Sequence, residues 1–536
     1  MAKPWDSRRV PGVSLFSDRP GAVLDVRLEG EDPRALVAAW ESELRAILRD
    51  VGWNDESTAS RLSQQDLSLF VTAPIDALYA ATEVNELAFE RAAAVLAGER
   101  PGPLAEDVTR LRQAIHDERS PALLALAEAA KARGVAFVPD DRSVSVGLGR
   151  GSVTFSKNAI PNPDDVPWDR VSDVPVVMVT GTNGKTTTVR LLGAIAAAAG
   201  RVPGVTTTDG LRVGDEAIGS GDYSGPEGAR RILRDPRVEV AILETARGGI
   251  QRRGLVLPRI DAAAITNVAE DHIGEFGVHG VEDVADVKML VARIVEPGGV
   301  VVLNADDPVL AARAAGLAAR VAWFSLAPSE ETRALARIPI AFGGGAPHNV
   351  ANALAASRLA EALDLPADAI ARGLESFDGS PKRNPGRANL LDLGGVRVLL
   401  DYAHNPHGMR ALVTLARSLP AARRLLLIGQ AGDRDDEAIR ELVRAAWALA
   451  PDRVVIKEMT AHLRGREPGA IPAVIEDELR RAGAAADSIE HAGSEVDGVR
   501  AALGWARPGD LLVLTVHAER GSVLDMLESR SRERPA

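Results

Sequence analysis

Short apolar runs alternate with longer amphipathic stretches over most of the chain, beginning near Val174. The short runs are rich in Val, Ile and Leu and are bounded by turn residues, which predicts buried strands at Val174–Thr180, Val238–Leu243, Asp261–Thr266, Val300–Leu303, Val396–Leu400, Leu425–Ile428, Arg453–Ile456 and Leu511–Thr515. Apolar residues recurring every three to four positions predict helices at Thr186–Ala199, Val281–Ile294, Asn349–Ala362, Glu437–Ala448 and Ala470–Ala482. This alternation predicts two parallel sheets, each covered on both faces.

The part of the chain before Val174 has a different pattern. It holds helical stretches around Leu36–Asp50, Ile75–Leu96 and Ala122–Arg133, and a glycine-rich piece at Val146–Val153. Two polar, proline-containing segments, Pro161–Val174 and Asp378–Arg387, are typical of a linker and of an interdomain connection. A chain of 536 residues has room for three or four domains. The pattern favours three, at residues 1–165, 173–384 and 385–536.

Composition excludes several classes of protein. The 63 Lys and Arg residues are outnumbered by 75 Asp and Glu, and a net charge of −12 argues against a partner that is nucleic acid. The chain has no cysteine, which excludes disulfides, thiolate metal sites and a catalytic thiol. No apolar run nears the roughly 20 residues that a bilayer requires, and Met1–Pro11 lacks the apolar core of a signal peptide. We therefore expect a cytoplasmic protein with no membrane partner.

The strongest chemical signal is a phosphate-binding loop between the first predicted strand and the first predicted helix. The loop and the start of the helix consist of Gly181, Thr182, Asn183, Gly184, Lys185, Thr186 and Thr187. Backbone N–H groups of such a turn, together with the positive end of the helix dipole, form a cradle for the phosphates of ATP. Lys185 can reach the β- and γ-phosphates, and the Thr186 hydroxyl can bind Mg²⁺. The usual first glycine is replaced by Val179, and the alternative is a glycine turn that only links strand to helix.

The segment GTNGKTTT at 181–188 resembles the Mur ligases, which form amide bonds at the expense of ATP. Further segments in the same order support this resemblance: ETARGGI at 244–250, TNVAEDH at 266–272, NADDP at 304–308, PHNVAN at 347–352, PGR at 385–387 and DYAHNP at 401–406. TTTDG at 206–210, GDRDDE at 432–437 and LRGREPG at 463–469 are most similar to the Mur-ligase half of cyanophycin synthetase. The N-terminal part resembles that enzyme only weakly, mainly around Ser120–Arg150.

The resemblance implies an α/β fold in which a P-loop NTPase-type central domain is followed by a Rossmann-like C-terminal domain and preceded by a smaller α+β domain. Cyanophycin synthetase also carries an ATP-grasp domain between its N-terminal and Mur-type domains. Here Arg150 and Val174 are 24 residues apart (174 − 150), far below the size of about 100 residues that such a domain needs. We therefore expect the ATP-grasp step, and with it autonomous cyanophycin synthesis, to be missing.

The resemblance also implies a catalytic metal site made by Thr186, Glu244, His272 and Lys288, with Lys185 beside it and two Mg²⁺ ions. Lys288 matches the Mur-ligase lysine that CO₂ converts to a carbamate, a carboxylate-like ligand. From the residues alone, Lys288 would be a surface lysine, Glu244 a strand-end acid and His272 a turn histidine. Because Glu244 and His272 both follow strands of one parallel sheet, the joint site is favoured.

Further residues receive roles from the resemblance. Asn349, Arg387 and Asp401 would contact the nucleotide, and closure of one domain onto another would exclude water. Asn349 could instead be a helix N-cap, and Arg387 a solvated linker charge. Arg247, His404, Asn405 and Arg464 are candidates for substrate binding, although a basic turn and a turn-forming role are equal alternatives for the first three.

We therefore expect an ATP-dependent ligase that couples a small-molecule or peptide carboxylate to an amino acid or amine, with an arginine-like amine as one candidate. Three alternatives stay open: a ligase of peptidoglycan precursors or folylpolyglutamate, an ATP-binding scaffold without activity, and a plain phosphoryl-transfer enzyme. The segments ETARGGI and LRGREPG argue against the first, and an intact set of metal ligands argues against the second. Self-association into a homo-oligomer through the N-terminal domain is a separate hypothesis.

Overall fold

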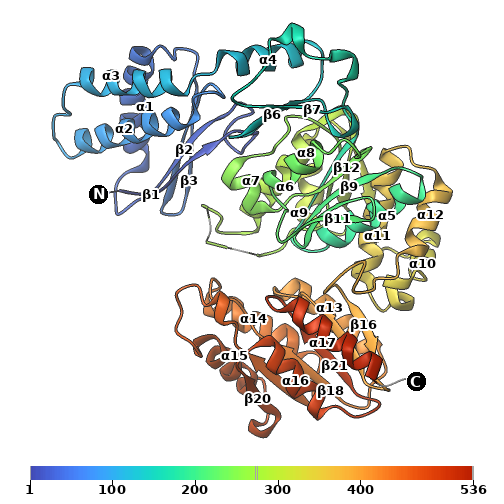
Figure 1. Cartoon of the computed structure of the whole chain (residues 1–536). Helices are drawn as coiled ribbons and strands as arrows, with labels where there is room; N and C mark the ends of the chain where they lie inside the picture. The colour runs from blue at the N-terminus through green and yellow to red at the C-terminus, as the bar shows by residue number, and fades with distance from the viewer. Residues whose placement is uncertain (1, 272, 275, 534–536) are drawn as a thin grey trace. The chain divides into compact units, whose positions relative to one another are not determined.

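The computed structural model describes residues 2–271, 273–274 and 276–533, which fold into two compact units (Figure 1). One unit comprises Met1–Trp323 and Arg358–Pro366, and the other comprises Phe324–Ser357 and Ala367–Ala536. The fold is α/β, as predicted, with parallel sheets in both units. None of the described helices is both long enough and apolar enough to cross a membrane.

The first unit begins with an antiparallel sheet that carries helices. Its strands run in the order β1-β2-β4-β3, with bounds β1 Lys3–Val10, β2 Gly21–Arg27, β3 Thr58–Ser63 and β4 Asp66–Thr72. The helices are α1 Pro33–Val51, α2 Leu78–Leu96 and α3 Leu104–Glu118. The fully buried Trp40 donates a hydrogen bond to Asn85 Oδ1 (2.9 Å), and Asn85 donates to the Leu69 carbonyl (2.9 Å). These bonds tie both helices to the sheet.

A three-stranded antiparallel sheet connects this domain to the eight-stranded central sheet. It consists of β5 Phe137–Pro139, β6 Ser143–Val146 and β7 Val153–Ser156, and α4 Pro121–Ala132 packs on it. The predicted linker Pro161–Val174 is packed rather than loose, because Trp168 lies against the same apolar cluster and donates to the Pro163 carbonyl (2.8 Å). Between β7 and the next strand the chain forms only the short 3₁₀ turns Pro163–Asp165 and Trp168–Arg170.

The central sheet has eight strands in the order β11-β10-β9-β12-β8-β13-β14-β15. Their bounds are β8 Val176–Thr180, β9 Pro203–Thr207, β10 Gly210–Val213, β11 Glu216–Ser220, β12 Val240–Glu244, β13 Ile260–Ile265, β14 Val295–Asn304 and β15 Arg320–Phe324. The strands from β9 to β14 in this order are parallel, whereas the β9–β10–β11 edge is antiparallel and was not predicted. Its helices are α5 Lys185–Ala198, α6 Pro226–Leu233, α7 Arg247–Arg253, α8 Val281–Arg293 and α9 Pro308–Arg313.

The second unit is built around a six-stranded sheet in the order β16-β17-β21-β18-β19-β20. All pairs are parallel except β16–β17, and the bounds are β16 Asn389–Asp392, β17 Arg397–Asp401, β18 Arg424–Ile428, β19 Arg453–Lys457, β20 Ile489–Ala492 and β21 Leu511–Thr515. The later helices are α10 Glu330–Leu335, α11 Pro347–Ala362, α12 Ala367–Ser376, α13 Pro406–Ser418, α14 Asp436–Trp447, α15 Ala470–Arg481, α16 Glu495–Trp505 and α17 Arg520–Glu533. Every strand and helix predicted after Val174 is present, and β14 starts earlier than predicted.

Candidate functional site

The phosphate-binding loop follows β8 at the carboxyl edge of the central parallel sheet, where α5 begins. Gly181 (φ 146°) and Gly184 (φ 89°) have backbone angles that side-chain-bearing residues rarely adopt. A Cβ at Gly181 would lie 1.9 Å from Thr266 Oγ1, so only glycine fits between the loop and the end of β13. The predicted strand–turn–helix context of the loop is therefore present.

The next loop along the sheet edge fixes the shape of the phosphate-binding loop. Thr182 N donates to the Asn267 carbonyl and Asn183 N to Asn267 Oδ1, both at 2.9 Å. Thr266 Oγ1 donates to the Asn183 carbonyl (2.6 Å). Because side chains and backbone of the loop after β13 satisfy these groups, the cradle is preorganised by the protein itself.

Lys185 folds back over its own loop. Its Nζ atom donates to the carbonyls of Gly181 and Thr182, each at 3.0 Å. The ammonium therefore lies at the mouth of the glycine turn, which is where the charge of a bound phosphate would be neutralised.

Glu244 ends β12 and is the hub of an oxygen cluster beside the loop. This carboxylate is 2% exposed, and it accepts hydrogen bonds from Thr186 Oγ1 (2.8 Å) and Thr208 Oγ1 (2.7 Å). The backbone N–H of Thr208 donates to the same carboxylate (3.2 Å). A carboxylate and two hydroxyl groups are the hard oxygen ligands that Mg²⁺ prefers, and Mg²⁺ usually takes one or two carboxylates plus substrate phosphates. The cluster therefore fits Mg²⁺.

Lys288 is buried, not on the surface. It lies on α8, is 4% exposed, and donates from Nζ to the Gly181 carbonyl (2.8 Å). Burial, assisted by the nearby Lys185 and Arg247 charges, lowers the pKa of Lys288 well below its ordinary value, while Asp271 opposes the shift. The amine at this position is thus disposed to be neutral.

The metal site predicted from the sequence is only partly visible. Thr186, Glu244 and Lys288 come together around the phosphate-binding loop, but His272 lies outside the described residues. Within those residues, no three Asp, Glu, His or Cys side chains form a metal-binding group. Arg247 is buried at the start of α7, and its charge acts on Lys288.

In the second unit, Asp401 ends β17 and holds two backbone segments together. Its carboxylate accepts from Ala388 N (2.7 Å) and Ala403 N (2.8 Å), and burial raises its pKa although Arg387 acts in the opposite direction. The Arg387 guanidinium lies over the Tyr402 ring, 4.3 Å from its centroid. Asp401 and Arg387 are thus neighbours in the second unit.

Three other candidates have local structural roles. Asn349 is not a helix N-cap, because α11 begins two residues earlier at Pro347; it is buried and donates from Nδ2 to the Ile340 carbonyl (2.9 Å). Asn405 caps α13 by accepting from Gly408 N (2.8 Å). His404 Nδ1 lies 3.1 Å from the Tyr402 carbonyl oxygen, within the turn that precedes α13. The turn-forming alternative therefore applies to His404 and Asn405.

Arg464 is exposed and lies at φ 50°, in the segment between β19 and α15. The neighbouring Arg466 ties that segment to the loop after β18, because it donates to the Gly432 carbonyl (3.1 Å) and pairs with Asp436 (2.6 Å). Arg464 is thus presented to solvent by a segment that its neighbour anchors.

Thr208 and Asn267 were not among the site residues predicted from the sequence. Thr208 lies in TTTDG and Asn267 in TNVAEDH, two segments that carried the resemblance without a role for these side chains. Their position after β9 and β13, at the same sheet edge as Glu244, was the signal that could have identified them.

Comparison with known proteins agrees with this geometry. Residues 179–360 match the Mur ligase middle domain, and residues 386–516 match the Mur ligase, glutamate ligase domain. The chain therefore contains the middle and C-terminal domains of the Mur ligases.

Its relatives include cyanophycin synthetases. The chain is 38% identical over 368 residues to cyanophycin synthetase from Synechocystis sp., covering 60% of this chain and 42% of that protein. It is 36% identical over 398 residues to cyanophycin synthetase from Geminocystis herdmanii, covering 68% of this chain and 44% of that protein. It is 28% identical over 382 residues to UDP-N-acetylmuramoyl-L-alanyl-D-glutamate–2,6-diaminopimelate ligase from Geobacter metallireducens. This match covers 64% of this chain and 73% of that protein. The chain thus spans less than half the length of the cyanophycin synthetases that it matches.

Proposed function

We propose that this protein is an ATP-dependent ligase that joins a carboxylate to an amino acid or amine, with release of ADP and phosphate. The observation that carries the proposal is the oxygen cluster Thr186–Glu244–Thr208 beside the phosphate-binding loop and Lys185. A protein that only binds ATP as a scaffold has no need for a buried carboxylate held by three donors at that position.

The proposed reaction has two steps. In the first, an oxygen of the substrate carboxylate attacks the γ-phosphorus of ATP, the bond to the β–γ bridging oxygen breaks, and ADP leaves. In the second, the amine nitrogen attacks the carbonyl carbon of the acyl phosphate, the C–N bond forms, phosphate leaves, and the amine loses a proton. Lys185 and the loop N–H groups would hold the phosphates against the approaching carboxylate. The products are an amide, ADP and phosphate.

Mg²⁺ fits beside Glu244, where it would neutralise phosphate charge and orient the γ-phosphate. Thr186 and Glu244 would hold it from the protein side, and Thr208 would keep the Glu244 carboxylate in place. His272 remains a predicted Mg²⁺ ligand.

Lys288 is the proposed site of the carbamate. The neutral amine would attack CO₂, forming an N–C bond and losing one proton, and the resulting group would be anionic. Burial and the adjacent Lys185 favour the neutral amine that this reaction needs. We expect Lys288→Ala to reduce turnover strongly, with partial rescue by short carboxylic acids, measured as phosphate release. An unaffected Lys288→Ala enzyme would exclude this role.

The substrates are inferred from the resemblance. An arginine-like amine stays the candidate that the resemblance in the sequence implied, and the carboxylate would be a small molecule or a peptide. We propose that Arg247 and Arg464 contact the substrates, with Asn349, Arg387 and Asp401 on the nucleotide.

One assay tests the proposed function. Phosphate release is measured with ATP and Mg²⁺ against a panel of carboxylates crossed with amino acids, including arginine. We expect release that requires both a carboxylate and an amine, and an amide product detectable by mass spectrometry. ATP hydrolysis that never depends on an amine would refute the ligase function. Lys185→Ala is the inactive reference, and Lys157→Ala, a half-buried lysine outside the site, is its matched control.

A further inference from the structure

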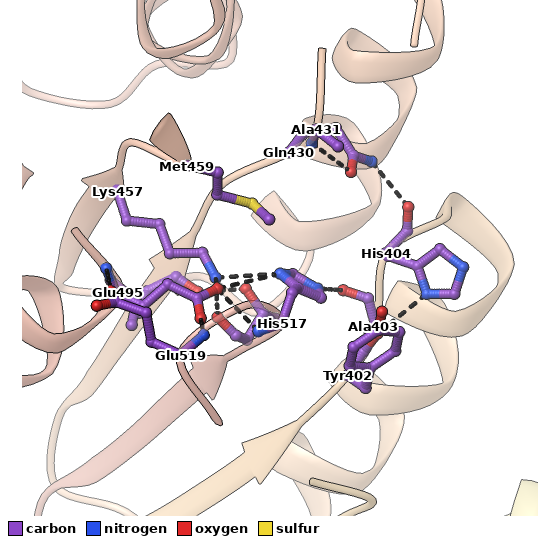
Figure 2. A network of polar contacts seen from close by, with 12 residues as sticks. Tyr402, Ala403, His404, Gln430, Ala431, Lys457, Met459, Glu495, His517 and Glu519 are labelled. Atoms are coloured by element: carbon purple, nitrogen blue, oxygen red, sulfur yellow. Dashed lines mark hydrogen bonds and ion pairs between the residues drawn. The ribbon is translucent and has the colours of Figure 1, made fainter. Parts of the chain in front are cut away.

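A buried polar network crosses the carboxyl edge of the second unit's sheet, and its central residues have no role assigned above (Figure 2). Its centre is Lys457, at the end of β19, which is 1% exposed. Lys457 Nζ contacts three acceptors: Glu495 Oε1, the Thr515 carbonyl (2.5 Å) and His517 Nδ1 (3.1 Å). An ammonium has three donors and no acceptor, so this set satisfies it completely.

The partner carboxylate is equally well satisfied. Besides Lys457, Glu495 accepts from His517 N (2.8 Å) and Glu519 N (2.6 Å). Glu519 in turn accepts from Glu495 N (2.8 Å) and Val496 N (3.2 Å) at the start of α16. Burial raises the pKa of Glu495, but its contact with the His517 side chain (3.5 Å) and the Lys457 charge outweigh burial and keep the pKa well below its ordinary value. Burial lowers the pKa of Lys457, but the charge of Glu495 and its hydrogen bond oppose this shift, and the three acceptors around Nζ fit an ammonium.

The network assigns the tautomer of His517. Its Nδ1 faces the Lys457 ammonium and must accept, so the ring proton lies on Nε2. His517 Nε2 then donates to the Ala403 carbonyl (3.2 Å) in the loop after β17. Burial and the Lys457 charge lower the pKa of His517 to about 4, so the ring stays neutral at physiological pH.

The same histidine contacts the aromatic ring that supports Arg387. The Tyr402 and His517 rings meet edge-on with centroids 5.0 Å apart, and Arg387 lies over the Tyr402 ring. Figure 2 shows His517 between Lys457 and the Tyr402–His404 segment. His517, which has no role assigned above, thus contacts the ring on which Arg387 lies. It also bonds to Ala403, two residues after Asp401.

We propose that His517 is a positioning residue. Its Nε2–H and the edge of its ring hold the Tyr402–His404 segment in place. Through Tyr402, they hold the Arg387 guanidinium where it contacts the nucleotide. Lys457 and Glu495 act through His517 by fixing its tautomer. This inference rests on the proposed function for the roles of Arg387 and Asp401. It adds a set of buried residues that never touch the substrates.

Two substitutions separate the functions of the two ring nitrogens. His517→Asn places an amide near Nδ1 and cannot reach Ala403, whereas His517→Gln places an amide N–H near Nε2 and retains that donor. We expect His517→Asn to raise KM for ATP roughly tenfold, the effect of one lost hydrogen bond, with a smaller change in kcat. His517→Gln should stay within about threefold of the wild type. His491→Asn, an exposed histidine paired with Glu476 in the same unit, is the matched control and should be unchanged.

A spectroscopic measurement tests the tautomer. In ¹⁵N-histidine NMR of the full chain, we expect His517 to show a protonated Nε2 and an unprotonated Nδ1 from pH 6 to 8. Lys457→Met/Glu495→Gln removes the charged pair together, because a single substitution would leave a buried charge without its partner. In this variant we expect the tautomer preference to weaken and KM for ATP to rise as in His517→Asn.

The outcomes distinguish this inference from the proposed function. If wild-type phosphate release never depends on an amine, the ligase function fails, and calorimetric Kd values for ATP with Mg²⁺ still compare His517→Asn with His517→Gln. Equal values for these two variants, or a wild-type His517 with its proton on Nδ1, would overturn the positioning role. Weaker binding by His517→Asn alone, with unfolding curves that match His517→Gln, supports it.

Discussion

At the scale of single residues, the candidate site depends on hydroxyl groups that orient a buried carboxylate. Glu244 cannot reach solvent, so its position is determined by Thr186 and by the side chain and backbone of Thr208. A hydrogen bond to a charged acceptor contributes about 1.5–3 kcal/mol, more than a bond between neutral groups. Removing one hydroxyl should therefore affect catalysis without unfolding the protein.

Thr208→Val tests this dependence. The substitution keeps the shape of the side chain and removes the donor to Glu244 Oε1, so we expect phosphate release to fall roughly tenfold or more and the Mg²⁺ requirement to rise. Thr208→Ser keeps the hydroxyl and should retain most of the activity. Steady-state kinetics over a Mg²⁺ titration provide the measurement, and equal rates for both variants would show that Glu244 needs no such donor.

At the scale of elements, the phosphate-binding loop depends on close packing of its backbone against the end of β13. Gly181→Ala would place a Cβ 1.9 Å from Thr266 Oγ1 at a φ of 146°. We expect loss of ATP binding by calorimetry, together with a lower melting temperature, because the loop must move away from β13. Gly504→Ala is the control: it lies in α16 with open space around it, and alanine there should stabilise by up to about 1 kcal/mol. Unaltered ATP affinity in Gly181→Ala would contradict the proposed role of the loop.

His517, which follows β21 in the second unit, predicts that the free energy of unfolding depends on pH. His517 has a folded-state pKa of about 4 against an ordinary value of 6.5. Between these values the unfolded chain binds a proton that the folded chain does not, so the free energy of unfolding should decrease as pH falls from 6.5 towards 4. The loss from this group is at most about 1.4 kcal/mol per pH unit. Urea unfolding of wild type and His517→Gln at several pH values measures it.

The variant should show a shallower slope across that window. Some slope should remain, because burial and the nearby His407 lower the pKa of His348 to about 4 as well. Parallel curves for the two proteins would mean that His517 titrates normally in the folded state.

At the scale of the whole molecule, the N-terminal module, made of the β1–β4 sheet and helices α1–α3, is docked on the central-sheet domain within the first unit. Leu255 N donates to the Val13 carbonyl (2.8 Å) and Gly12 N to the Arg253 carbonyl (3.3 Å), so β1 is followed by a short bridge to the end of α7. Arg61 pairs with Asp283 on α8 (2.7 Å), the helix that carries Lys288. The module therefore contacts both helices on which Arg247 and Lys288 lie.

Gly12→Ala should weaken this docking. A Cβ at Gly12 would lie 1.9 Å from the Leu255 carbonyl oxygen, so the bridge must open. We expect faster limited proteolysis between the N-terminal module and β8, and reduced phosphate release because α7 loses its support. Gly102→Ala, in the same module with open space around it, should behave as wild type. Identical digestion patterns for both variants would show that the bridge contributes little to docking.

The alternating strands and helices after Val174 can be predicted from the sequence. Val, Ile and Leu runs such as Val176–Thr180 and Leu511–Thr515 are apolar on both faces, as strands buried between helices are. The glycine turn before Lys185 predicts an anion-binding loop. These elements can be predicted because a few neighbouring residues are enough to specify each of them. The strands of the N-terminal sheet gave no such signal: β1 carries Asp6 and Arg8 among its alternating positions, and Arg8 is buried only because it pairs with Asp25 on β2.

Which side chains come together could be seen only in the tertiary structure. Lys288 looked like a surface lysine by spacing, yet α8 packs it against Gly181, 107 positions earlier. Thr208 and Glu244 are joined only because β9 and β12 are adjacent parallel strands. Lys457, Glu495 and His517 are far apart in the chain and meet where β19, α16 and β21 converge. The physical reason is the same in each case: a buried polar group must find its partners, and the partners come from strand order, which no local pattern encodes.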